Sequence, residues 1–185
     1  MALKQIRIHG RGGQGAVTCA QLLAVAAFKD NKSCQAFPFF GVERRGAPVT
    51  AFCRVDDKYI RTREQVYAPD YVMVLDASLL EAVNVAEGLG DKGMIIINTN
   101  EDAKKLKIST KAEIKAIDVT KIALEKIGKP FVNAPMLGAF VAATGLVSLD
   151  SLIAAVRENF ESKPEIAEKN IAAVRAAYDA VKKKK

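Results

Sequence analysis

Short apolar runs alternate with longer stretches of helical periodicity along this chain of 185 residues. The runs YVMVLD at 71–76 and MIIIN at 94–98 are apolar almost throughout, as is typical of parallel strands that are buried on both faces. A helix over about residues 14–29 separates a first strand from a second strand at 33–37. The pattern predicts an α/β fold: a Rossmann-like, mostly parallel sheet with helices on both faces.

Other segments complete this predicted fold. VTAFCRV at 49–55 alternates between apolar and polar positions, and a short run at 59–61 follows a polar turn, which predicts an inserted β-hairpin. A helix is expected over 78–87, ended by Gly88 and Gly90. A further strand is expected over 115–118.

The C-terminal third is predicted to be helical. Asn133 is expected to cap a helix that has Pro135 in its first turn and small residues along its length. Ser148 is expected to start the next helix, and Ser162 with Glu165 to form a capping box for the last one. No repeat or low-complexity linker interrupts the chain, so residues 1–185 are expected to form a single domain.

Composition and charge exclude several classes of protein. The formal net charge is +7, but four of the positive charges belong to the tail Lys182–Lys185, which is expected to be solvated. The other positive charges are not interleaved with stacking aromatics, so nucleic acid is not an expected partner. No apolar run approaches the ~20 residues that cross a bilayer, and no charged-then-apolar leader is present, so we expect a cytoplasmic protein without a membrane partner.

Patterns typical of catalytic or metal-binding side chains are scarce in this sequence. Cys19, Cys34 and Cys53 form no CxxC pair, which argues against a zinc site, an iron–sulfur cluster or a disulfide framework, and each is expected to be a small buried residue. His9 is the only histidine and is expected to be a satisfied side chain at a strand end. Because no Ser–His–Asp set, carboxylate pair or P-loop lysine is present, we assign no catalytic residue and no metal ligand, and expect the chain to act within a larger assembly.

The segment HGRGGQGA at 9–16 is the strongest motif. Its glycines fit G-x-G-x-x-G with one glycine added, and it lies between the first strand and the first helix, where free N–H groups and the helix dipole favour a phosphate. Arg11 adds a positive charge. A tight turn that binds no ligand is the alternative. The candidate binding residues in this motif are Gly10, Arg11, Gly12, Gly13, Gln14, Gly15 and Ala16.

One part of the dinucleotide fingerprint is missing. A site for NAD has an acidic residue at the end of the second strand, about 20 residues after the glycines. Asp30 has this spacing but lies at the exit of the first helix, and the second strand leads into Pro38 without an acid at its tip. The motif therefore predicts a phosphate site that lacks the mark of an NAD site.

The segment after the second strand adds two arginines to the candidate site. Arg44 and Arg45 follow a cluster of phenylalanines, and the guanidinium group suits phosphate or carboxylate. The segment is expected to lie near the glycine turn because strand ends of a parallel sheet open on the same edge. The alternative is that Glu43 pairs with one arginine and the aromatic rings cover the sheet. At the neighbouring strand ends, Asp76 is expected to cap the helix that follows it.

Four blocks taken together resemble one family. They are RIHGRGGQGAVTCAQLLA, FPFFGVERRGAPVTAFCRV, YVMVLDASLL and NAPMLGAF, in this order along the chain. The chain resembles the gamma subunit of the 2-oxoacid:ferredoxin oxidoreductases over nearly its whole length. The second block is more similar to the pyruvate or branched-chain 2-oxoacid branch than to the 2-oxoglutarate branch, and aryl glyoxylate relatives remain an alternative.

The resemblance implies a division of labour between subunits. Partner subunits of the alpha, beta and delta type would carry thiamine diphosphate and 4Fe–4S clusters, decarboxylate a 2-oxoacid such as pyruvate, and reduce ferredoxin. Coenzyme A would receive the acyl group, and this chain would help bind it. The amides of Gly12–Ala16 would then hold the diphosphate of coenzyme A while Arg44 or Arg45 meets another phosphate. The alternatives are a stand-alone oxidoreductase that binds NAD or FAD, and a purely structural subunit.

Overall fold

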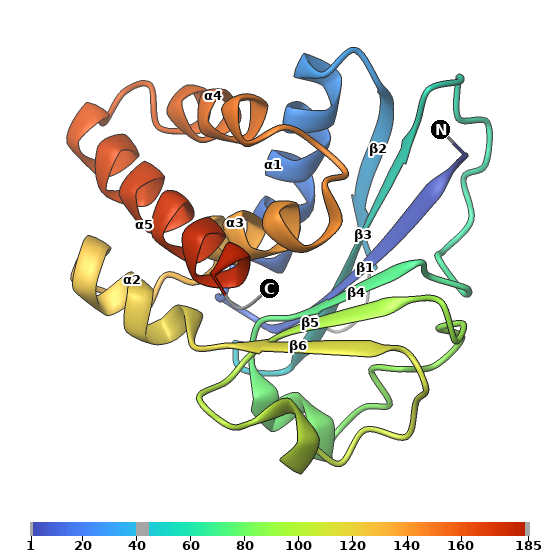
Figure 1. The fold of residues 1–185 in the computed structure, drawn as a ribbon. Coiled ribbons are helices and arrows are strands. Elements are labelled where there is room, and N and C mark those ends of the chain that lie inside the picture. Colours follow the sequence, from blue (N-terminus) through green and yellow to red (C-terminus); the bar gives the residue numbers. More distant parts are fainter. Residues whose placement is uncertain (1, 40–44, 184–185) are drawn as a thin grey trace.

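The computed structural model describes residues 2–39 and 45–183, and within them the chain forms a mixed six-stranded sheet beside a layer of α-helices (Figure 1). The strand order is β2-β3-β1-β4-β5-β6. Strands β1, β4, β5 and β6 are parallel to one another, as predicted for a Rossmann-like sheet. The strands are β1 (Lys4–Arg11), β2 (Ser33–Pro38), β3 (Pro48–Asp56), β4 (Tyr71–Val74), β5 (Met94–Asn98) and β6 (Glu113–Ile117).

The predicted hairpin between residues 49–55 and 59–61 is wrong. Strand β3 runs antiparallel to β1 on one side and to β2 on the other, so the hairpin is formed by β2 and β3. Both edges of β3 are therefore occupied, and residues 59–61 form no strand. The fully buried Arg54 instead fixes the loop that follows, because its guanidinium donates to the backbone oxygens of Glu64, at 2.5 Å, and Gln65, at 3.2 Å.

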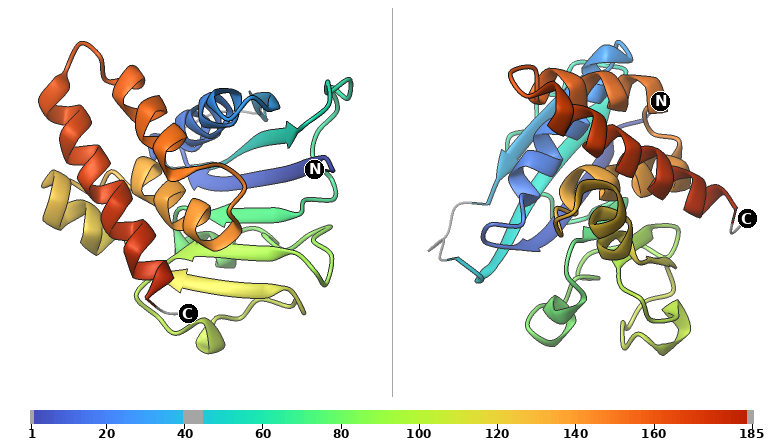
Figure 2. Two further views of the ribbon diagram at one scale, coloured as in Figure 1. Left: turned by 45° about the horizontal axis from the view of Figure 1, so that its top comes forward. Right: turned by 90° about the vertical axis from the view of Figure 1, so that its left-hand side faces the viewer.

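Among the residues that the structure describes, the α-helices lie on one side of the sheet, with α2 beyond the carboxyl ends of the strands, where it packs against α5 (Figures 1 and 2). Their side chains and the inward side chains of the strands form one large core, whereas a smaller core lies under the opposite face. The helices are α1 (Ala16–Lys29), α2 (Val119–Ile127), α3 (Asn133–Thr144), α4 (Leu149–Asn159) and α5 (Pro164–Lys182). No helix in the described part of the chain is long and apolar enough to cross a membrane.

The opposite face is covered by short 3₁₀-helices and loops, which refines the expectation of helices on both faces. The helix predicted over 78–87 is only the 3₁₀-helix η1 (Ala77–Glu81), and a second 3₁₀-helix, η2 (Ala103–Lys105), lies further along the chain. The Asn84 side chain accepts from the N–H of Ala86 at 3.2 Å, and such a local turn competes with helix continuation.

The helix ends agree only in part with the predicted caps. Ser148 caps α4 as expected, with its hydroxyl accepting from the N–H of Ser151. Helix α3 begins one residue earlier than expected, with Val132 at the cap position, so Asn133 is not the cap. The capping box of Ser162 and Glu165 is also wrong, because α5 begins after Lys163 with Pro164 in its first turn and no side-chain cap. Proline at this position already has the φ angle that a helix needs.

Helix α3 packs closely against α5, as its small residues predicted. A Cβ atom at Gly138 would overlap the carbonyl oxygen of Val174 in α5. Nearby, the ring of Phe140 meets Tyr71 of the sheet edge-on, with ring centroids 5.6 Å apart. Contact of the α3 backbone with α5 therefore depends on the absence of a side chain at Gly138.

We expect G138A to destabilise the fold by about 1–3 kcal/mol, because the added methyl group forces two packed helices apart. The measurement is urea unfolding of the purified chain. G90A is the matched control, since Gly90 is exposed and a Cβ there meets nothing within 4 Å; it should change the free energy of unfolding by no more than about 0.5 kcal/mol. Equal stability of the two variants would contradict the role of Gly138.

Candidate anion-binding site

The turn between β1 and α1 contains backbone conformations and close contacts that suit glycine. Gly13 and Gly15 have φ angles of 95° and 81°, which side chains rarely allow. At Gly10, an added Cβ would lie 3.2 Å from the Cβ of Ala16 and 3.3 Å from a methyl group of Leu75. The glycines predicted to form a phosphate-binding turn therefore bring the start of α1 close to the ends of β1 and β4.

Two of the five amides proposed to bind phosphate already have partners. The N–H of Gly12 donates to the carbonyl oxygen of Ala47 at 2.9 Å, and the N–H of Gln14 donates to that of Arg11 at 2.9 Å. The other three have no protein partner among the described residues, and they lie where the helix dipole is positive. These three free amides belong to Gly13, Gly15 and Ala16.

The side chain of Asp76 braces this turn from the end of β4. One carboxylate oxygen accepts from the amide of Gln14 at 2.8 Å and lies 3.5 Å from Nε of Arg11. The other accepts from the N–H and the hydroxyl of Ser78, at 3.0 and 2.6 Å. Gln14 completes the link, because its side-chain oxygen accepts from the N–H of Arg11 at 2.8 Å. Asp76 thus caps η1, which confirms its predicted capping role.

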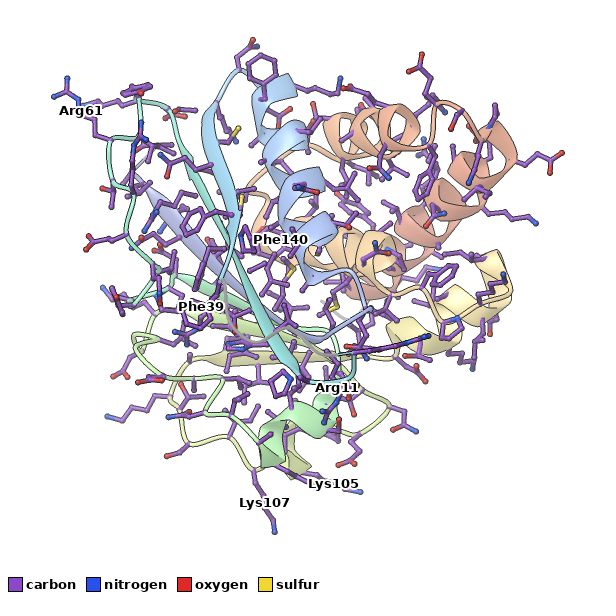
Figure 3. The ribbon with its side chains drawn as sticks, turned by 180° about the vertical axis from the view of Figure 1, so that it is seen from behind. Arg11, Phe39, Arg61, Lys105, Lys107 and Phe140 are labelled. Atoms are coloured by element: carbon purple, nitrogen blue, oxygen red, sulfur yellow. The ribbon has the colours of Figure 1, made fainter. Side chains whose placement is uncertain are left out.

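This network favours the charged form of Asp76. Partial burial disfavours the ionised carboxylate, but hydrogen bonds from Ser78 and Gln14 and the charge of Arg11 outweigh it and lower the pKa of Asp76. The guanidinium of Arg11 is also held beside Asp76, since it donates to the hydroxyl of Ser78 at 2.7 Å and to the carbonyl oxygen of Gly46 at 3.1 Å. Figure 3 shows Arg11 beside the short η1 helix.

Two hollows open on either side of the turn. The first, which we call the basic hollow, has a volume of about 520 Å³ and lies between the starts of α1 and β3. The second, which we call the strand-end crevice, has a volume of about 930 Å³ and lies at the carboxyl ends of β4, β5 and β6. The basic hollow is lined by Arg11, Gly12, Gly13, Gly15, Ala16 and Arg45, among others; the strand-end crevice by Asp76, Asn98, Thr99, Asp118, Lys121 and Phe131, among others.

Arg45 lies where the sequence predicted it, on the wall of the basic hollow, and its side chain is exposed. Arg44 and Glu43 lie outside the residues that the structure describes, so the alternative in which Glu43 pairs with an arginine is not tested. The antiparallel strand β3 begins beside the turn and brings Arg45 to it.

Asn98 lines the strand-end crevice, but its side chain is hydrogen-bonded to backbone groups. Its oxygen accepts from the N–H groups of Val119 and Thr120, at 3.0 and 3.1 Å, and its NH₂ group donates to the carbonyl oxygen of Leu75 at 2.9 Å. These bonds join β5 to the start of α2 and the end of β4. Asn98 therefore shapes the crevice.

Asp30 does not occupy the place of the acidic residue in an NAD site. It caps the end of α1, and its carboxylate accepts from Ser148 and Ser151 at distances of 2.6–2.8 Å. Strand β2 ends at Pro38 without an acid, as the sequence indicated.

His9 is the satisfied strand-end histidine that the sequence predicted. It is 7% exposed and lies 3.1 Å from Nε of Arg7, and burial together with that positive charge lowers the pKa of His9 to about 3. Cys19 and Cys53 are fully buried, as expected, and burial raises the pKa of both thiols. Among the described residues, no three histidine, cysteine or acidic side chains gather as metal ligands.

Comparison with known proteins identifies the family. The model of the family described as pyruvate ferredoxin/flavodoxin oxidoreductase matches residues 5–180. The chain belongs to this family. It is 55% identical to pyruvate synthase subunit PorC of Methanothermobacter thermautotrophicus, over 97% of this chain and 96% of that one. It is 53% identical to the common gamma subunit of the pyruvate/ketoisovalerate oxidoreductases of Pyrococcus furiosus, over 95% of each chain.

A solved structure of the family has the same fold. The crystal structure of pyruvate oxidoreductase subunit PORC from Thermotoga maritima superposes with a TM-score of 0.86, at 38% identity and with 97% of each chain covered. The family resemblance found in the sequence is thus confirmed over nearly the whole chain.

The network that braces the turn is not predicted by the sequence pattern. The 2.8 Å bond between Gln14 and Asp76 joins residues that are 62 positions apart. The sequence holds one indication of this contact. Both residues lie just beyond the ends of parallel strands, where side chains gather at one edge of a sheet. The bond between Gly12 and Ala47 had no such signal, since it depends on the unpredicted place of β3.

We expect D76N to destabilise the chain by about 1–2 kcal/mol at pH 7, because it removes charge-assisted hydrogen bonds at a partly exposed site. The pKa of Asp76 is lower in the folded chain than its unfolded value of about 3.9. The difference between wild type and variant should therefore be complete well above pH 4 and shrink as the pH falls below it. Urea unfolding at several pH values measures this difference.

D91N serves as the control for that experiment. The Asp91 side chain is 72% exposed, and its carboxylate lies 3.9 Å from Nζ of Lys111. D91N should therefore change the free energy of unfolding by a negligible amount at every pH. A loss for D76N that is the same at pH 3 and pH 7 would show that its charge does not brace the turn.

Proposed function

We propose that this chain is the gamma subunit of a 2-oxoacid:ferredoxin oxidoreductase of the pyruvate synthase type. The complex would convert a 2-oxoacid and coenzyme A to acyl-CoA and CO₂, with reduction of ferredoxin in the cytoplasm. Two relatives that the chain matches over nearly their whole length carry the printed names pyruvate synthase subunit PorC and common gamma subunit, which supports this role. Thiamine diphosphate and 4Fe–4S clusters would lie on partners of the alpha, beta and delta type.

Within that complex, we propose that the glycine turn helps bind coenzyme A. The observation that carries this proposal is the basic hollow, where three free amides and the exposed Arg45 border one space, with Arg11 held beside them by Asp76 and Ser78. Backbone N–H groups at a helix start and guanidinium groups are the donors that phosphate prefers. Each charge-assisted contact would contribute roughly 1.5–3 kcal/mol. A nucleotide with several phosphates, such as coenzyme A, suits this set of donors.

Pyruvate is the substrate that we propose, with 2-oxoisovalerate as the second choice. Both follow from the names of relatives, which include pyruvate synthase and the pyruvate/ketoisovalerate oxidoreductases. A gamma subunit that two such enzymes share, as in Pyrococcus furiosus, implies that the choice of 2-oxoacid is made by another subunit. In the complex proposed for this chain, the choice of 2-oxoacid would likewise be made by another subunit.

A purely structural subunit is the competing function, and one observation favours it. The turn is braced from within by Asp76, Gln14 and the bond between Gly12 and Ala47, so it holds its shape without a ligand. In that case the free amides would face a partner chain. The competing function predicts that no charge near the turn affects the use of coenzyme A.

We expect the double replacement R44A/R45A, in the assembled complex, to raise the KM for coenzyme A about tenfold or more. Loss of one charge-assisted contact corresponds to at least this factor. Steady-state kinetics should show an unchanged KM for pyruvate, because the change is confined to the nucleotide site.

The matched control is K58A/R61A, which removes two exposed positive charges from the loop after β3. Figure 3 places Arg61 at the opposite end of the molecule from Arg11. This control should leave both KM values unchanged. An unaltered KM for coenzyme A in R44A/R45A would remove these arginines from the site and favour the structural function.

A further inference from the structure

The strand-end crevice plays no part in the site proposed for phosphate, although it is the larger of the two hollows. It lies at the carboxyl ends of β4, β5 and β6, with α2 along one side (Figure 1). Four carboxylates and one lysine are among its lining residues, so the crevice is negatively charged overall. The carboxylates are those of Asp76, Glu101, Asp118 and Glu125, and the lysine is Lys121.

Two of these carboxylates have partners within the chain and two do not. The carboxylate of Asp118 caps α2 by accepting from the N–H of Lys121 at 2.8 Å, and that of Asp76 braces the glycine turn. Glu101, after β5, and Glu125, in α2, are exposed, and neither side chain forms an ion pair or a hydrogen bond with another residue that the structure describes. The crevice therefore holds two carboxylates, from different elements, that can accept from a cationic group.

An apolar rim lies beside these carboxylates. Leu124 of α2 and Phe131, just before α3, line the crevice, yet they are 51% and 53% exposed. The backbone of this rim is ordered, because Gly128 ends α2 with a φ angle of 80° and the N–H of Phe131 donates to the carbonyl oxygen of Lys129 at 2.8 Å. The next residue, Val132, is buried. An exposed aromatic ring on an ordered segment is typical of an anchor in a protein–protein interface.

The carboxylates and the rim together favour one kind of occupant. A phosphate would be repelled by the carboxylates, and a purely apolar group would bury them without a partner. A lysine or arginine flanked by apolar side chains satisfies both features, since its charged group can reach Glu101 and Glu125 while its aliphatic stem packs on Leu124 and Phe131. This chain is a subunit of an oxidoreductase complex, as its relatives are, so other subunits are the chains that it meets.

We propose that the strand-end crevice docks a segment of another subunit of the complex, in which a lysine or arginine is flanked by apolar side chains. The cationic group lies between Glu101 and Glu125, and the apolar side chains cover Leu124 and Phe131. The inference rests on membership of a multi-subunit enzyme, and it does not depend on the binding of coenzyme A.

The first test measures how tightly the chain binds the remaining subunits when the complex is reconstituted. F131A should raise the Kd about tenfold or more, because truncation of an aromatic anchor usually has at least this effect. E101Q/E125Q should raise the Kd about fivefold at low salt and make it less dependent on ionic strength, because the attraction between opposite charges is lost.

Matched controls remove the same kinds of side chain outside the crevice. Y67A truncates an aromatic residue that is 67% exposed, and E64Q/D91N neutralises two exposed carboxylates. Both controls should bind the remaining subunits like the wild type. All four variants change exposed positions, so urea unfolding of each purified chain should give the stability of the wild type.

The second test identifies the occupant. Phe131 is replaced by the photo-reactive amino acid p-benzoylphenylalanine, the complex is assembled and irradiated, and mass spectrometry identifies the cross-linked peptide. The expected peptide belongs to another subunit and contains a lysine or arginine beside apolar residues. The same replacement at Tyr67 is the control, and it should not capture this peptide.

Two outcomes would overturn the inference. An unchanged Kd in both F131A and E101Q/E125Q would show that the crevice is not an interface. A cross-link from position 131 to a second copy of this chain would show that the crevice joins copies of the subunit. Both tests measure assembly, whereas the binding of coenzyme A is tested by the KM of R44A/R45A, so the failure of one proposal is distinguishable from the failure of the other.

Discussion

Three glycines leave the turn between β1 and α1 with Gln14 as its one side chain, so its shape depends on hydrogen bonds with other parts of the chain. Asp76 supplies one set through Gln14 and Arg11, and the start of β3 supplies the other through the Ala47 carbonyl oxygen. These bonds fix the direction of α1 and leave three amides free. The position of both hollows depends on this bracing.

The antiparallel strand β3 explains why this sheet differs from a regular Rossmann sheet. It takes the place beside β1 that a parallel β2 would otherwise occupy, and it brings Arg45 to the turn. A regular NAD site needs an acid at the tip of an adjacent β2. Here β2 is one strand further away, and Asp30 is engaged by Ser148 and Ser151. The place of β3 therefore removes the position of a ribose contact and adds a positive charge beside the turn.

The sequence predicted those parts of the fold that local patterns determine. The apolar runs that became β4 and β5, the glycine turn and the cap at Ser148 were found because their signals lie within a few residues. The hairpin was wrong because VTAFCRV shows only that a strand exists, and its partners are chosen by the whole sheet. The helix after Asp76 ended early through a local turn at Asn84, which apolar periodicity does not register. At the candidate site, local patterns predicted the glycine turn and a nearby arginine, whereas the contacts between residues distant in the sequence have no local signal.

A subunit without catalytic groups can still affect a reaction through the orientation of a ligand. Interactions that hold a reacting group in place can lower a barrier by several kcal/mol, because the freedom of that group is lost before the chemical step. Under the proposed function, the glycine turn would hold coenzyme A in place without any group that reacts. The partner subunit would then need only to bring its acyl group to the bound coenzyme A. The contribution of this chain to the reaction would then be geometric.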